Sequence, residues 1–141
     1  MFFKEGNPVS SKTDVLWVDS HALILEYNRA ISETWLGRTI AFKSSIREAM
    51  LALIGAITNN QPPDLIVAEV GSDIGIRGWA LAETIRNHTN RGIKYLPICL
   101  LTTDPVGDKE RARAEKLGVT IEEKGSLEEN LKTIHSLCEE K

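Results

Sequence analysis

The chain has 141 residues, of which 42% are hydrophobic and 26% charged, with a formal net charge of −3. This length and composition predict one globular domain with a substantial core. The negative balance argues against a nucleic-acid-binding surface, and no apolar stretch approaches the roughly 20 residues of a membrane span. Cys99 and Cys138 lie far apart in apolar settings and are interpreted as buried thiols, as expected of a cytoplasmic protein.

Residues 1–13 are polar, contain glycine, proline and serines, and are expected to form a flexible leader to a domain spanning residues 14–141. Short apolar runs then alternate with segments of helical periodicity. The expected strands cover residues 15–19, 39–42, 64–70, 97–103 and 119–121. The expected helices cover residues 20–36, 45–58, 79–88, 105–117 and 126–138.

Local signals support the helix boundaries. Ser45 and Ser126 each stand three residues before a glutamate, the spacing of a capping box. Asp104 and Pro105 resemble an N-cap acid followed by a proline in the first turn. The apolar residues of the first helix are spaced along one face, the pattern of a helix that packs on a core. These residues are Ile24, Tyr27, Ile31 and Trp35.

Five alternations of strand and helix predict a doubly wound α/β domain, with a five-stranded parallel sheet covered by five helices on its two faces. Asp19, Glu69, Thr102 and Lys124 fall at or just beyond the carboxyl ends of the first, third, fourth and fifth strands. They converge if the strand order is 2-1-3-4-5, the flavodoxin-like order, in which such strand ends form the site.

From about Asp14 to Cys138, the chain resembles the receiver domain of two-component response regulators. The segment Val15–Ser20 is similar to the family's first strand with its acidic pair, and Asp64–Glu69 to the strand that carries the phospho-acceptor aspartate. The hydroxyl of Thr102 and the amine of Lys124 stand where the family's phosphoryl-binding residue and pocket lysine are found. Gly78 is similar to the glycine that opens the family's third helix.

The departures from the family pattern carry the most functional information. The acceptor position holds Glu69, which is one methylene longer than aspartate, and Ser20 replaces the acid that is a direct magnesium ligand in the family. The loop from residue 69 to residue 78 is about one residue longer than usual. Three further positions differ from the family pattern. Thr103 replaces a small residue, Gly125 replaces a proline in a cis linkage, and Ile121 replaces the aromatic residue of the switch.

These changes predict a pocket without the normal phosphorylation cycle. Asp19 and Glu69 alone would give at most a weak Mg²⁺ site, because Mg²⁺ requires octahedral oxygen geometry at about 2.0–2.1 Å. Displacing a nucleophile by about 1 Å can cost about two orders of magnitude in rate. The longer carboxylate of Glu69 is instead expected to reach toward Lys124 and Thr102, as a partial mimic of a phosphoryl group.

The resulting hypothesis is a degenerate receiver domain that is not an enzyme and acts as a protein-interaction module. A signalling partner or a second copy is expected at the face formed by the helix 105–117, the strand 119–121 and the last helix. One alternative is a phosphorylatable single-domain regulator that uses Glu69 or the nearby Asp73. Another is a flavodoxin-like nucleotide- or phosphate-binding protein that uses the glycine-containing loop Gly71–Gly78, although its spacing matches no phosphate-binding motif.

Overall fold

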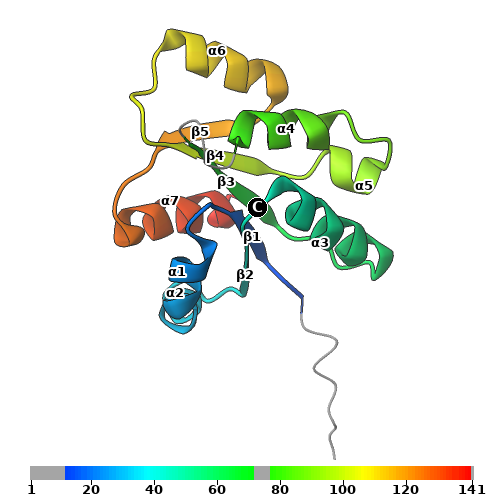
Figure 1. The fold of residues 1–141 in the computed structure, drawn as a ribbon, viewed down its shortest axis with the longest axis vertical. Helices are drawn as coiled ribbons and strands as arrows, with labels where there is room; N and C mark the ends of the chain where they lie inside the picture. Colours follow the sequence, from blue (N-terminus) through cyan, green and yellow to red (C-terminus); the bar gives the residue numbers. More distant parts are fainter. Residues whose placement is uncertain (1–11, 72–76, 141) are drawn as a thin grey trace, which may run out of the picture.

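The computed structural model describes residues 12–71 and 77–140, and Figure 1 shows their arrangement. One parallel sheet has the strand order β2-β1-β3-β4-β5, which confirms the predicted topology. Its strands are β1 (Val15–Val18), β2 (Ile40–Lys43), β3 (Leu65–Val70), β4 (Ile98–Thr102) and β5 (Thr120–Glu123). Most of the expected leader, residues 1–11, lies outside the described residues.

Seven helices, rather than the predicted five, occur in the described ranges. They are α1 (Ala22–Tyr27), α2 (Arg29–Leu36), α3 (Ile46–Thr58), α4 (Gly78–Arg86), α5 (Arg91–Lys94), α6 (Asp108–Leu117) and α7 (Leu127–Glu139). The expected first helix is divided at Asn28, a residue type that competes with regular helical bonding. The additional α5 is a single turn that is capped by the side chain of Asn90.

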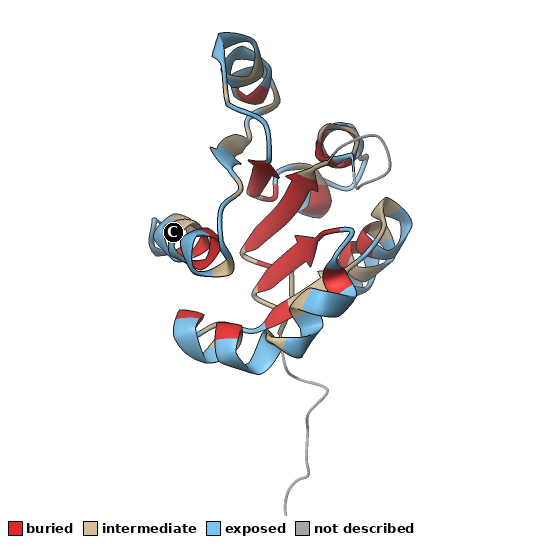
Figure 2. Ribbon diagram, turned by 60° about the vertical axis from the view of Figure 1, so that its left-hand side comes forward, coloured by how far each residue is buried: buried red, intermediate tan, exposed pale blue. Residues whose placement is uncertain are grey.

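The two faces of the sheet carry separate apolar clusters, as the two-residue period of strands requires. Leu16, Ile66 and Leu100 pack with α3, α4 and α5 on one face. Trp17 and Leu101 belong to the other face, which α2 and α7 cover. In Figure 2 the central strands are buried while the outer sides of the helices are exposed. No helix in the described part of the chain is long and apolar enough to cross a membrane.

The starts of two helices agree with their capping signals, and the start of a third does not. The hydroxyls of Ser45 and Ser126 accept bonds from the backbone N–H groups of Glu48 and Glu129 at 3.1 and 3.2 Å. The prediction that α6 begins at Asp104–Pro105 is wrong, because the helix starts three residues later. There the side chain of Glu110 accepts a bond from the N–H of Gly107 at 3.1 Å.

The apolar face of the expected first helix does not pack on the core. Ala22, Ser32 and Leu36 are the buried residues of α1 and α2. The larger apolar side chains lie on the opposite side of the helix pair and are exposed. The spacing therefore predicted an apolar stripe correctly, but the core contacts the other side of the helix pair, which carries Ala22, Ser32 and Leu36.

Candidate functional site

Two buried carboxylates and one lysine form a cluster at the carboxyl edge of the sheet. Asp19 follows β1, Glu69 lies near the end of β3, and these strands are hydrogen-bonded neighbours. The Nζ of Lys124, just beyond β5, lies 2.9 Å from Asp19 Oδ2 and 3.2 Å from Glu69 Oε2. The Asp19 side chain is 0% exposed and that of Glu69 is 6% exposed. One ammonium group thus bridges two carboxylates that water hardly reaches.

Backbone N–H groups at the start of α1 hold the other two oxygens of this cluster. The N–H of Ser20 donates to Glu69 Oε1 at 2.7 Å, and the N–H of His21 donates to Asp19 Oδ1 at 2.8 Å. The first N–H groups of a helix lack intrahelical acceptors and are free for such bonds. No residue type in the sequence marks these donors, and the signal for them is positional: a loop leads into a helix directly after Asp19.

The environment of Glu69 favours its charged form. Burial raises the pKa of this carboxyl, but the hydrogen bonds from Ser20 and the bond and charge of Lys124 outweigh burial and lower the pKa to about 2. For Lys124, burial lowers the pKa, and the bonds and charges of Asp19 and Glu69 more than compensate and raise it. Glu69 and Lys124 are therefore an ion pair over the whole range around neutral pH.

Thr102 is near this cluster but does not join it. Side chains alternate along strands, so the Thr102 side chain belongs to the face of Leu100, opposite to that of Glu69. Its hydroxyl accepts a bond from the backbone N–H of Asp104 at 3.1 Å. Its carbonyl accepts one from the N–H of Lys124 at 2.6 Å, and this bond positions the lysine.

A close contact between α4 and β3 fixes the backbone that carries Glu69. A Cβ atom on Gly78 would come within 2.6 Å of the carbonyl oxygen of Glu69. The contact is between backbone atoms, so no side chain could move aside to make room. An isolated bridge between Val70 and Arg77 joins the same two segments. Only glycine allows the first turn of α4 to approach the strand this closely.

Among the described residues, Asp19, His21 and Glu69 form the group that could hold a cation. Each offers one ligand atom, and these atoms lie within 4.8 Å of one another. The set fits Mg²⁺ poorly, because Lys124 contacts both carboxylates, Ser20 supplies only a hydroxyl, and imidazole is not a preferred Mg²⁺ ligand. An ion at this position would have to compete with the ammonium group for both carboxylates.

The loop between Gly71 and Gly78 lies largely outside the described residues. The alternative acceptor Asp73 and the central part of the expected phosphate-binding loop fall in the range 72–76, where the structure describes nothing. The three family departures other than Glu69 and Ser20 lie within the described part. Thr103 and Gly125 are exposed, and Ile121 is partly buried.

Comparison with known proteins gives a consistent result at the level of the fold. No family model matches the sequence, and no curated protein matches it in sequence. Among solved structures, the chain is similar to the chemotaxis protein CheY4 of Vibrio cholerae, with a TM-score of 0.65, 22% identity and coverage of 90% of this chain and 99% of that one.

Two further solved structures are comparable. A two-component response regulator from Cytophaga hutchinsonii has a TM-score of 0.69 and 20% identity, covering 93% of this chain and 100% of that one. A two-component response regulator from Clostridium difficile has a TM-score of 0.63 and 25% identity, covering 91% and 97%. The fold is therefore that of a CheY-like response regulator receiver domain. The predicted resemblance to receivers is confirmed at this level.

Proposed function

We propose that this domain is a degenerate receiver that acts as a protein-interaction module in two-component signalling, without the normal cycle of aspartyl phosphorylation. The observation that carries the proposal is the bridge from Lys124 Nζ to Asp19 and Glu69 at 2.9 and 3.2 Å. By the resemblance to receivers, Lys124 is the lysine of the phosphoryl pocket. Here two protein carboxylates already pair with it.

The chemistry of Glu69 supports the loss of phosphoryl transfer. Oε1 accepts a hydrogen bond from Ser20 and Oε2 contacts Lys124, so both oxygens have partners before any phosphodonor approaches. With a pKa of about 2, the carboxylate is held in a stabilised, weakly basic form, whereas a nucleophile requires an environment that activates it. A metal ion that would offset the charge of an incoming phosphoryl group finds the poor ligand set described above.

The same contacts support a fixed conformation. The cluster joins the ends of β1, β3 and the segment after β5, so the strand edge that phosphorylation would rearrange is already tied by one ion-pair network. Glu69 supplies one negative charge, where a phosphoryl group supplies about 1.5 to 2, so the mimicry is partial. Ile121 provides no aromatic side chain to move between two switch positions.

On this proposal, the domain signals by binding another protein and not by a phosphoryl-transfer reaction. The domain is not an enzyme, Mg²⁺ binds at most weakly, and a signalling protein binds at the face formed by α6, β5 and α7. Arg113 of α6 is engaged with α4, where it stacks on Trp79 at 4.4 Å and pairs with Glu83 at 3.2 Å, so it is not counted in this face. The charged side chains of α6 provide a polar surface that suits a regulated contact better than a permanent one.

Glu69→Gln tests the fixed pocket directly. Glutamine keeps the shape of the side chain and removes its charge, so the contact with Lys124 should weaken while the fold is retained. We expect backbone amide shifts in the NMR spectrum at Ser20, Thr102 and Lys124. The matched control is Glu83→Gln, which removes an equivalent charge from the exposed pair with Arg113. If the amide signals around the cluster respond no more to the first substitution than to the second, Glu69 does not hold the pocket.

A further inference from the structure

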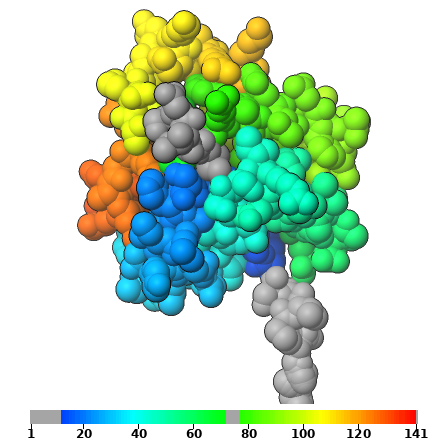
Figure 3. All heavy atoms as spheres, in the orientation of Figure 1, coloured from blue at the N-terminus to red at the C-terminus, as the bar shows by residue number. Residues whose placement is uncertain are grey.

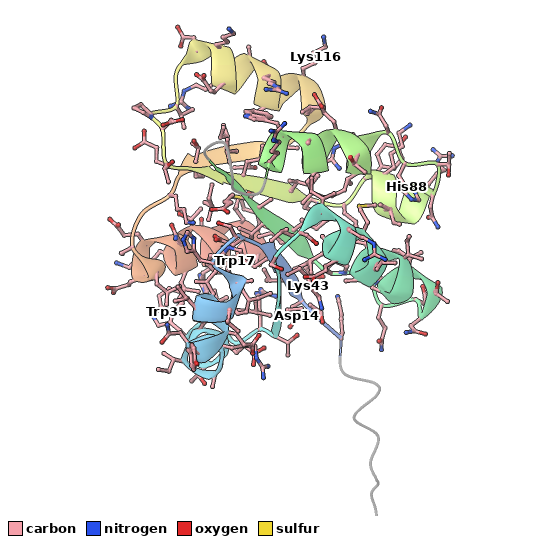
Figure 4. The ribbon with its side chains drawn as sticks, viewed as in Figure 1. Asp14, Trp17, Trp35, Lys43, His88 and Lys116 are labelled. Atoms are coloured by element: carbon pink, nitrogen blue, oxygen red, sulfur yellow. The ribbon has the colours of Figure 1, made fainter. Side chains whose placement is uncertain are left out.

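The apolar side chains of α1 and α2 form an uncovered surface, which is here named the α1–α2 patch. Leu23, Ile24, Tyr27, Ile31 and Trp35 are 78%, 60%, 85%, 69% and 44% exposed. In Figure 3 the atoms of these two helices form a ridge on the front of the molecule. Figure 4 labels Trp35 on α2, next to α7, and Trp17 within the sheet. The patch borders α7 at Trp35, whose ring contacts His135, and it includes no residue of α6 or β5.

The exposed area of the α1–α2 patch is comparable to the area that one partner buries in a protein–protein interface. Its five side chains expose on the order of 700 Å², more than the roughly 300–600 Å² of the largest apolar patch on a typical monomer. A standard stable interface buries about 800 Å² on each partner. Two copies of this patch facing each other could bury up to the exposed area of the patch on each side, which is close to that of an ordinary stable dimer. The patch also contains a tyrosine and a tryptophan, the residue types that dominate binding energy.

The charges around the patch favour a second copy of this chain over a charged partner. Arg29 pairs with Glu26 and also lies 3.5 Å from Glu33, so residues 22–36 carry a net charge of only −1. Such a small excess of one sign repels an identical surface only weakly. Residues 22–36 contain no lysine and a single arginine, which does not fit an anionic lipid surface, where a basic polar face is needed.

We propose that the α1–α2 patch is a homodimer interface in which two copies pack antiparallel about a two-fold axis. With the axis near Arg29 and Ala30, Ile24 faces Trp35 of the second copy, and Tyr27 faces Ile31 of the second copy. This pairing is isologous, so each contact is made twice. Trp35 is already oriented by an edge-on contact with His135 of α7, at 5.8 Å between ring centroids. The contact uses α1, α2 and the part of α7 next to Trp35, which leaves α6 and β5 open to a different protein, and the dimer does not depend on the proposed lack of phosphorylation.

Analytical ultracentrifugation of the full chain tests this proposal, over protein concentrations from about 1 µM to about 1 mM. We expect a monomer–dimer equilibrium that Ile31→Glu weakens by at least tenfold, because each dimer then buries two unpaired charges. Tyr27→Ser is the second variant and should weaken the dimer without adding charge. The matched control is Leu51→Glu, which places the same charge on an exposed leucine of α3, and it should leave the equilibrium unchanged. Circular dichroism checks that each variant is folded.

Three results would overturn the homodimer. The wild-type chain could be a monomer at every concentration. A dimer could persist in both Ile31→Glu and Tyr27→Ser, which would place the contact elsewhere. Alternatively, a monomeric wild-type chain could bind vesicles of phosphatidylcholine and phosphatidylglycerol and lose this binding in Ile31→Glu, which would assign the patch to a lipid surface.

Discussion

Replacing Lys124 by methionine is expected to lower the free energy of unfolding by about 3–5 kcal/mol, the typical cost of removing one partner from a buried ion pair. Methionine keeps much of the length of the side chain and removes its charge. Asp19 and Glu69 would then lie close together with no cation between them, and both are almost fully buried. Urea denaturation at pH 7 measures the loss. Lys109→Met, on the exposed side of α6, should change stability by less than about 0.5 kcal/mol.

A second substitution distinguishes a broken ion pair from a simple packing defect. Adding Glu69→Gln to Lys124→Met removes one of the two repelling carboxylates, so the double variant should be more stable than the Lys124→Met variant alone. Lost packing gives no such recovery, because the two effects would then add. A loss for Lys124→Met no larger than that of the Lys109 control would mean that the bridge does not stabilise the fold.

Acidification is expected to lower the free energy of unfolding, because Glu69 contributes up to about 3 kcal/mol to it at neutral pH and this contribution is lost in acid. Its pKa in the folded state is about 2, below the ordinary value of 4.5, so the unfolded chain binds the proton more readily. The stabilisation is therefore complete above about pH 4.5 and is lost as the pH falls toward 2. Lys124 is protonated throughout this range and does not titrate.

The measurement is the free energy of unfolding of the wild type and of Glu69→Gln at intervals from pH 7 to pH 2.5. The difference in stability between the two proteins should be largest at neutral pH and should narrow through the acid range. A difference that stays constant with pH would contradict a charged, hydrogen-bonded Glu69. Because pH 2.5 still lies above the folded pKa of about 2, the difference that remains there contains the effect on packing together with a small residue of the charge contribution.

The periodicity of the sequence was sufficient to predict the strands of the sheet and their order. Runs such as Leu65–Val70 are buried on both faces and bounded by turns, and alternation with helices leaves few possible topologies. The proximity of Asp19, Glu69 and Lys124 followed from strand order alone. The apolar stripe of α1 and α2 was also visible, but periodicity gives the residues of a stripe and not the surface that it contacts.

What the sequence did not predict depends on backbone geometry. The residue types permit the division of the first helix at Asn28 and the N-cap of α6 at Gly107 but do not require them, because local hydrogen bonds decide both positions. The N–H donors of Ser20 and His21 are common to all residues and leave no compositional signal. The face of the sheet on which the Thr102 side chain lies follows from the alternation of side chains along β4. This alternation can be compared with that of Glu69 only when the register of β3 and β4 is known.

The central claim is that Glu69 holds the pocket and does not react. Incubation with a small-molecule phosphodonor and Mg²⁺, followed by intact-mass spectrometry, tests it most directly. The double variant Ser20→Asp/Glu69→Asp, which supplies the acids of the receiver pattern, is the matched comparison. We predict no change in the mass of the wild-type protein. A gain of about 80 Da, the mass of one phosphoryl group, on Glu69 or on any other acid of the wild-type chain would contradict this claim.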